Sequence, residues 1–182
     1  SELERITKNS IMMRANTEIG VASTKTFMAT IEIFFILSLY FAQIHNIQND
    51  KDLIFDQLKI LPSKIDNIFK NSNQIIDLAK LYSKYNNFLF LGRGQNYPIA
   101  MEGALKLKEL SYIHAEGYPA GEMKHGPISL IDSNMPVFNI VTDGPYLNKM
   151  ISNIREIQSR KGKIIVLTNC PEKLDPSWYN DI

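Results

Sequence analysis

The pattern of hydrophobic and polar positions changes along the chain, and from about residue 87 it alternates between two kinds of segment. Short apolar runs at Asn87–Gly92, Met135–Thr142 and Lys163–Asn169 have the length and composition of buried strands. Longer segments at Pro98–Ile113 and Tyr146–Lys161 are typical of helices. Strand, helix, strand, helix, strand predicts an α/β fold with a parallel sheet covered on both faces. We therefore expect a three-layer α/β/α sandwich that begins near residue 50.

The N-terminal part shows helical patterns only. Residues Thr17–Ala42 indicate a loop followed by one long helix, for which Ser23 and Thr24 are N-cap candidates. The polar stretch His45–Asp52 has the composition of a linker or a long turn. Two amphipathic helices are expected after this stretch, at Leu53–Lys70 and Asn73–Tyr85.

The long helix contains an apolar run, Phe27–Ile44, that is almost long enough to cross a membrane, since a span needs roughly 20 residues. Glu32 and Gln43 interrupt the run, and no second apolar run of this kind follows. We interpret the run as a helix buried in a core or in a subunit interface, and we expect no membrane partner.

Composition places the chain among ordinary globular proteins and narrows its partners. Of its 182 residues, 45% are hydrophobic and 21% are charged, and the net charge is +1. The basic residues are scattered, so nothing indicates nucleic acid or an anionic membrane. The single cysteine, Cys170, excludes an internal disulfide and indicates a reducing compartment. No signal peptide is visible, so we expect a cytoplasmic protein.

The ends of the sequence look cut. The chain starts at Ser1 without a methionine, and it ends at Ile182 soon after a strand-like run. We expect it to be a fragment of a longer polypeptide.

Three charged residues stand out in the helix expected at Pro98–Ile113. At 100° per residue, Glu102, Lys106 and Glu109 fall within about 60° of one another. A salt-bridge stripe on an exposed helix explains them. However, the apolar residues between them leave no wide polar face, and buried charges are costly unless they are paired or used in chemistry. Residue pattern alone leaves both interpretations open.

Two glycine-rich segments are candidate binding loops. The first, Leu91–Pro98, lies between an expected strand and an expected helix, but Tyr97 stands where a dinucleotide fingerprint needs glycine. A tight turn or a contact with a sugar or phosphate explains this segment. The second, from Gly117 to Pro127, is expected to be a loop because it holds five glycine or proline residues. His125 in this loop is either a proton donor near neutral pH or a solvated side chain.

Small and hydroxylated residues precede the long N-terminal helix in TEIGVASTK, Thr17–Lys25. Backbone amides at a helix start suit a sugar hydroxyl or a phosphate. An ordinary N-cap explains the same residues, so these alternatives also stay open.

Taken together, three blocks resemble the glucosamine-6-phosphate synthase family, the isomerising glutamine–fructose-6-phosphate aminotransferases of the sugar isomerase (SIS) superfamily. The blocks are TEIGVASTK, then FLGRGQNYPIAMEGALKLKELSYIHAEGYPAGEMKHGPISLI, and DSNMPV. They cover nearly the whole chain in the family's order, and the part from Glu102 to Pro127 is the most specific.

The resemblance implies an SIS-type, doubly wound fold, of which two copies form the family's synthase domain. Residues 1–47 would be the C-terminal part of the first copy, and residues 48–182 most of the second copy without its C-terminal tail. It further implies a homodimer, a glutaminase domain in the same polypeptide, and neither a cofactor nor a metal. The glutaminase cysteine, the first copy's phosphate loops and the tail lysine have no counterpart here, so this piece is expected to be catalytically incomplete.

Site residues carry over by position. The family's base, which moves a proton between C1 and C2 of the sugar, corresponds to Glu109. Lys106 corresponds to a lysine that assists proton movements at the sugar oxygens, and Glu102 to a residue near the reacting sugar. His125 corresponds to the histidine that opens the sugar ring from the neighbouring subunit.

A second group, Val21, Ala22 and Ser23, corresponds to positions that bind the sugar phosphate. The function implied is the conversion of fructose 6-phosphate and glutamine to glucosamine 6-phosphate and glutamate. Two alternatives remain: a non-catalytic SIS module that senses sugar phosphates, and a related amino-sugar isomerase or deglycase.

Overall fold

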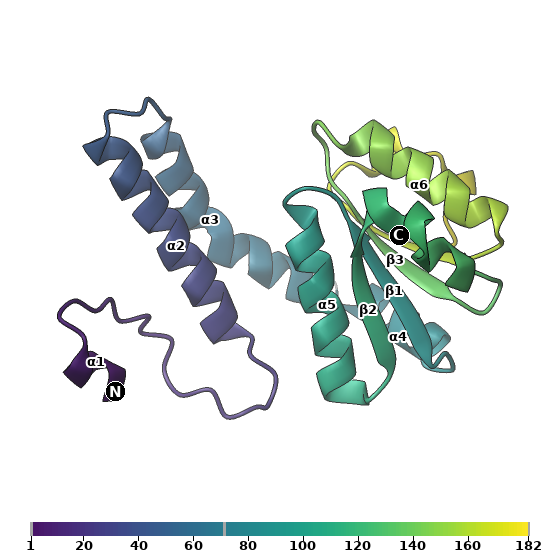
Figure 1. The fold of residues 1–182 in the computed structure, drawn as a ribbon, viewed down its shortest axis with the longest axis horizontal. Coiled ribbons are helices and arrows are strands. Elements are labelled where there is room, and N and C mark those ends of the chain that lie inside the picture. Colours follow the sequence, from purple (N-terminus) through teal and green to yellow (C-terminus); the bar gives the residue numbers. More distant parts are fainter. Residues whose placement is uncertain (1, 71, 182) are drawn as a thin grey trace. The chain divides into compact units, whose positions relative to one another are not determined.

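The computed structural model describes residues 2–70 and 72–181, without the side chain of Leu3. The chain divides into two compact units, with the boundary between residues 70 and 71. Each unit is described by itself (Figure 1).

The second unit contains a four-stranded parallel sheet in the order β2-β1-β3-β4. The strands are β1 (Asn87–Gly92), β2 (His114–Pro119), β3 (Pro136–Val141) and β4 (Lys163–Thr168). Helix α5 (Asn96–Ser111) joins β1 to β2, and helix α6 (Leu147–Ser159) joins β3 to β4. The strand order reverses direction between β1 and β3, as in doubly wound sheets.

Alternate residues of each strand supply two cores, one on each face of the sheet. Leu89 and Leu91 of β1 pack on the face that α6 covers, together with Ile154 of that helix. Phe88 and Phe90 pack on the other face, which α5 and the preceding helix α4 (Asn73–Tyr82) cover. Figure 1 shows α5 and α6 on opposite faces of the sheet. The expected three-layer α/β/α sandwich is confirmed.

Two short 3₁₀ helices follow β2 directly: η1 (Ala120–His125) and η2 (Pro127–Leu130). Two more follow β4: η3 (Pro171–Lys173) and η4 (Pro176–Trp178). Ala120 and Met123 anchor η1 in the α6-side core, since both are fully buried. The segment that carries His125 is therefore packed against the core of the second unit.

The prediction of a loop from Gly117 onward is wrong for the residues of β2. Gly117 and Pro119 were taken as turn signals, but both belong to a strand that pairs only with β1 among the described strands. Proline is tolerated on such an edge strand. Glycine is required for a different reason, because a Cβ at Gly117 would lie 2.6 Å from Cα of Met101. The other three strands and the two helices that follow the expected pattern lie within three residues of their predicted bounds.

The first unit contains helices α1 (Glu2–Ile6), α2 (Lys25–Ile44) and α3 (Lys51–Lys70). The long helix after the loop is confirmed, but the prediction that it is buried in a core is wrong for this chain, because none of its residues is buried. By length and composition alone, α2 qualifies as a membrane-spanning helix, with a mean hydropathy of 1.8. Its exposed apolar surface leaves the subunit-interface alternative as a prediction.

Candidate functional site

Three charged side chains form a continuous contact along helix α5. Nζ of Lys106 lies 2.6 Å from Oε2 of Glu109 and 3.3 Å from Oε1 of Glu102. These three residues, called the α5 stripe below, keep between 21% and 29% of their side-chain surface exposed. The helical period places them on one face, because residues three and four apart are neighbours on a helix. The sequence prediction that they lie together is confirmed.

The α5 stripe faces away from the sheet, since Ala100 and Ala104 are the helix residues buried against the strands. Its neighbours on the outer surface are apolar: Met101, Leu105 and Leu110 are all exposed. The ion pairs that a structural stripe would make are present, so pairing by itself does not separate the two interpretations. The apolar surroundings distinguish this stripe from the polar surface of an ordinary solvated helix.

Hydrogen bonds from Lys106, first to Glu109 and then to Glu102, raise the pKa of its ammonium group above its usual value. The stripe therefore keeps a fixed positive charge between two carboxyl groups across the neutral range. A carboxylate can accept and return a proton, and an ammonium group can stabilise negative charge developing on a nearby oxygen. The arrangement suits proton transfer next to a carbonyl.

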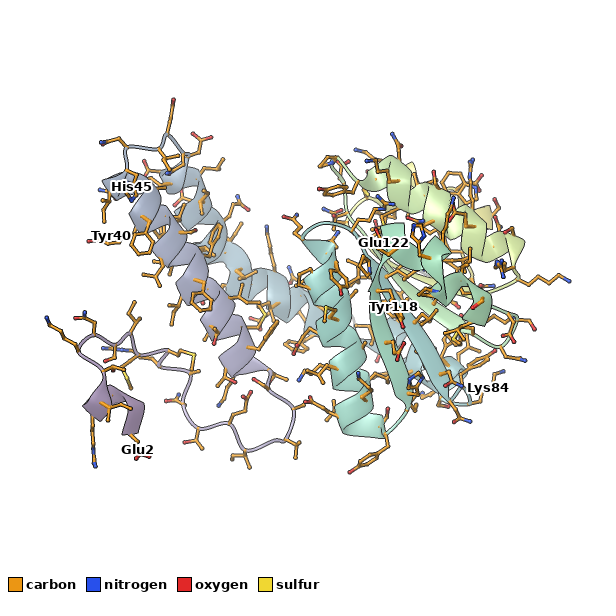
Figure 2. All side chains as sticks on the ribbon, viewed as in Figure 1. Glu2, Tyr40, His45, Lys84, Tyr118 and Glu122 are labelled. Atoms are coloured by element: carbon orange, nitrogen blue, oxygen red, sulfur yellow. The ribbon has the colours of Figure 1, made fainter. Side chains whose placement is uncertain are left out.

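His125 is placed apart from the stripe's own contacts. It ends η1, its side chain is 75% exposed, and Nε2 lies 3.9 Å from Oε2 of Glu122 on the same turn. Among the described residues, no hydrogen bond or ion pair joins His125 to Lys106 or Glu109. Figure 2 labels Glu122, which belongs to η1, and Tyr118, which belongs to β2. An exposed imidazole at the end of a seated turn is free to act on a molecule outside this chain.

The predicted phosphate-binding residues Val21, Ala22 and Ser23 belong to the first unit. Val21 is 90% exposed and Ala22 is buried, whereas Oγ of Ser23 lies 2.6 Å from Oγ1 of Thr26. Their loop leads into α2 at the N-cap position Thr24.

A carboxylate caps the start of α2. Thr24 makes no side-chain capping bond; instead, Glu18 accepts hydrogen bonds from the backbone N–H groups of Thr24 and Lys25, at 2.7 and 3.1 Å. Bonds from the Thr26 hydroxyl and the Thr24 amide lower the pKa of Glu18 to about 2. Thr24 occupies the N-cap position as expected, but the acceptor that caps the helix is the Glu18 carboxylate, six positions earlier, and not a Ser or Thr hydroxyl.

The glycine-rich turn after β1 has a structural explanation. A Cβ at Gly92 would lie 2.2 Å from the backbone oxygen of Asn96, and Gly94 has a φ of +53°. A Cβ built on Gly94 would also lie 2.4 Å from Cε2 of Tyr146. Both glycines are thus required for a tight turn, the first of the two interpretations from the sequence.

Buried polar residues are the part of the unit that the sequence analysis missed. Asn139 on β3 and Asn153 on α6 are at least 96% buried. Oδ1 of Asn139 has no hydrogen-bond partner, whereas Asn153 bonds to Arg93 and Glu156. A polar residue on the buried face of a helix is a usable signal, because such groups are costly without partners. Within residues 2–70 and 72–181, no group of three or more His, Cys, Asp or Glu side chains is placed to hold a metal.

The chain is similar in sequence to a known domain family and to several curated proteins. The SIS domain family matches residues 80–173. Curated glutamine–fructose-6-phosphate aminotransferases [isomerizing] are similar: that of Bacteroides thetaiotaomicron is 45% identical over 91% of this chain, and that of Gloeobacter violaceus is 46% identical over the whole chain. The chain spans only 27% and 30% of their respective lengths.

Among solved structures, the C-terminal domain of glucosamine-fructose-6-phosphate aminotransferase from Francisella tularensis superposes with a TM-score of 0.94. It is 38% identical, and the match covers all of this chain and 52% of that one.

Proposed function

The chain belongs to the SIS domain family, and from this premise we propose that it is the sugar-isomerising part of a glutamine–fructose-6-phosphate aminotransferase. The parent enzyme would convert fructose 6-phosphate and glutamine to glucosamine 6-phosphate and glutamate. Relatives that carry this name are 45% and 46% identical to the chain, which supports the proposal.

The observation that carries the proposal is the α5 stripe. Formation of an aldose-type product from a ketose requires a proton to leave C1 and a proton to reach C2. The Glu109 carboxylate takes the proton from C1, the electron pair of that C–H bond moves into the C1–C2 bond, and negative charge develops on the substituent at C2. Return of that proton to C2 restores the carboxylate, and the proton of the C1 hydroxyl passes to the substituent at C2, so that the carbonyl is left at C1.

Lys106 and Glu102 support that step in different ways. The ammonium group of Lys106, already bonded to Glu109, stabilises the enediol-like charge and assists proton movements at the sugar oxygens. Glu102 bonds to the same ammonium from the preceding turn and thereby fixes its position near the sugar. The raised pKa of Lys106 keeps this charge in place at neutral pH.

Residues outside the α5 stripe carry out ring opening and phosphate binding in this proposal. His125 opens the sugar ring of the neighbouring subunit, and its high exposure is consistent with a role across a boundary. Val21, Ala22 and Ser23 bind the sugar phosphate. This division of labour makes the parent a homodimer whose sugar pocket is shared between subunits.

The same proposal covers the organisation of the parent. Residues 1–47 complete a first SIS copy and residues 48–182 form most of a second, with a glutaminase domain elsewhere in the polypeptide and a cytoplasmic location. In the part of the chain that the structure describes, the start of α2 is already capped by Glu18, so the phosphate would be bound by the loop rather than by the helix end itself.

Turnover by the full-length parent tests the proposed function. Fructose 6-phosphate and glutamine are supplied, glucosamine 6-phosphate is quantified, and binding of fructose 6-phosphate is measured separately by calorimetry. Product formation supports the synthase. Tight binding without turnover identifies a sugar-phosphate sensor, and turnover of other amino sugars in a substrate panel identifies a related isomerase or deglycase; either result contradicts the proposal.

A further inference from the structure

Four side chains connect three elements of the second unit that are far apart in sequence. Nε of Arg93, just after β1, donates to Oδ1 of Asn153 on α6 at 3.2 Å. Nδ2 of Asn153 donates to Oε2 of Glu156 at 3.4 Å, and Oε1 of Glu156 lies 2.8 Å from Nζ of Lys124 on η1. These four residues, called the polar chain below, run from the end of β1 across α6 to η1.

Within the polar chain, the hydrogen bonds of Asn153 contribute more than the ion pair at Lys124. Asn153 is only 4% exposed and sits on the face of α6 that packs into the core, so its two hydrogen bonds are sheltered from water. The Lys124 end is weak by comparison, because that side chain is 61% exposed. The hydrogen bond between Arg93 and Asn153 is therefore the contact of the polar chain that best fixes the position of the Arg93 side chain.

Arg93 also touches η1 directly. A Cβ built on Gly121 would lie 2.9 Å from Nη2 and 3.3 Å from Cζ of Arg93. The guanidinium group thus fills the space beside the first turn of η1, while its Nε is held by α6. Glycine at this position lets the planar group approach the backbone closely.

The position of η1 decides where His125 lies. His125 is the last residue of η1, and the next residue, Gly126, has a φ of +151°, at which the chain changes course. Glu122 on the same turn is the only charged partner of His125 among the described residues, at 3.9 Å. Arg93 on one side of η1 and the buried Met123 on the other determine the direction in which the imidazole leaves the unit.

We propose that Arg93 is a positioning residue for His125, holding η1 so that the imidazole is aligned for ring opening. This inference rests on the ring-opening role of His125 in the function proposed above. The competing explanation is that Arg93 binds the sugar phosphate itself, since it lies in the glycine-rich turn that follows β1. The two explanations differ in which substrates need Arg93.

Two substrates separate them. Fructose 6-phosphate closes into a ring through O5, and the ring must open before C1 reacts. Its 5-deoxy analogue lacks O5 and carries phosphate on O6, so it stays open while keeping the phosphate. A positioning residue for ring opening is needed for the first substrate only, whereas a phosphate ligand is needed for both.

The experiment measures kcat/KM for both substrates with the full-length parent and glutamine. The variants are Arg93→Lys and His125→Asn, together with Gly121→Ala, which disturbs the same contact from the η1 side. Arg155→Lys is the matched control, because Arg155 lies on α6 but stacks on Trp178, 4.5 Å from the ring centroid. Circular dichroism and the thermal midpoint establish that each variant is folded.

We expect Arg93→Lys and Gly121→Ala to lower kcat/KM for fructose 6-phosphate roughly ten- to a hundredfold, and to leave the open-chain analogue within about twofold. His125→Asn gives the same selectivity with a larger loss, and Arg155→Lys changes neither substrate. Equal losses on both substrates, or no loss in Arg93→Lys, overturn the positioning role.

The controls separate this inference from the function beneath it. If the wild type turns over neither substrate, the proposed function fails and the inference fails with it. If His125→Asn is selective and Arg93→Lys is not, only the role of Arg93 is refuted.

Discussion

Nζ of Lys106 lies 2.6 Å from Oε2 of Glu109, one helical turn further along α5. The pair is joined by Glu102 on the other side of the ammonium group. The helix backbone thus holds the carboxylate that we propose for proton transfer next to the ammonium group that we propose for charge stabilisation. This is the form of preorganisation that acid–base catalysis requires.

Removing the ammonium group tests its part in the reaction. Lys106→Met in the parent is expected to lower kcat about a hundredfold, because developing negative charge loses its stabilising partner. Lys108→Met is the matched control, since Lys108 is exposed on the same helix and lies outside the stripe. Steady-state kinetics decides the point, and equal activity of the two variants would contradict the role of Lys106.

The pH profile gives a second test of the same residue. The pKa of Lys106 is raised by its bond to Glu109, so the stabilising effect of that bond is complete below the unfolded value of 10.5 and is lost only as pH rises past the folded value. We expect no loss of activity assignable to Lys106 below about pH 10. A fall in activity between pH 7 and 9 that is seen in the wild type and is absent in Lys106→Met would show that the ammonium group loses its proton earlier than expected, which contradicts this prediction.

Glu18 is expected to titrate far below an ordinary glutamate. Its pKa is lowered to about 2, chiefly by the Thr26 hydroxyl, so its stabilising effect on the start of α2 is present above the usual value of 4.5 and is lost as pH falls through 2. Carboxyl chemical shifts from NMR report this titration directly. Thr26→Val should move the midpoint toward 4.5, and an unchanged midpoint in that variant would rule out the hydroxyl as the cause.

Tyr82 and Asp181 join α4 to the far end of the described chain. The Tyr82 hydroxyl donates to Oδ2 of Asp181 at 2.6 Å, and burial followed by this bond raises the pKa of Tyr82. Tyr82→Phe is expected to lower the free energy of unfolding by about 1 to 3 kcal/mol, because a partly buried carboxylate loses its hydrogen-bond donor. The effect should be full below pH 10 and fade above it.

Urea unfolding measures this loss. Tyr85→Phe is the control, because the ring of Tyr85 lies tilted beside that of Tyr82, with ring centroids 5.8 Å apart, and its hydroxyl takes no part in the bond to Asp181. Equal midpoints for the two variants would show that the bond to Asp181 contributes nothing.

Gly117 sets the distance between β2 and α5. Since a Cβ there would lie 2.6 Å from Cα and 2.8 Å from N of Met101, Gly117→Ala must push the helix away from the strand. We expect a loss of about 1 to 3 kcal/mol in unfolding free energy, the usual effect of overpacking. Gly20→Ala serves as the control, because a Cβ at Gly20 meets nothing within 4 Å. A neutral Gly117→Ala in urea unfolding would contradict the close approach.

The sheet was largely predictable, and the exceptions have physical causes. Apolar runs such as the one at Asn87–Gly92 identify buried parallel strands, because both faces of such a strand are covered. Strand β2 escaped prediction because Gly117, which looks like a turn signal, is there to admit Met101. The exposure of α2 was not predicted either, since an apolar composition does not indicate which surface covers a helix.

The candidate site was predictable only within one helix. The period of α5 brings Glu102, Lys106 and Glu109 together, so spacing is enough. The bond from Arg93 to Asn153 spans 60 positions of sequence, and no local pattern encodes it. Contacts of that kind depend on how the strands are ordered in the sheet, which a single sequence leaves open.

The account rests most heavily on Glu109, and one comparison tests it directly. Wild-type full-length parent and Glu109→Gln are supplied with fructose 6-phosphate and glutamine, and glucosamine 6-phosphate is quantified. Glu172→Gln on η3 is the matched control, and fructose 6-phosphate binding shows whether each variant keeps its pocket. We expect Glu109→Gln to bind the sugar but to lose at least about a hundredfold in kcat, with Glu172→Gln unchanged. Full turnover by a folded Glu109→Gln would contradict the assignment of Glu109 as the base.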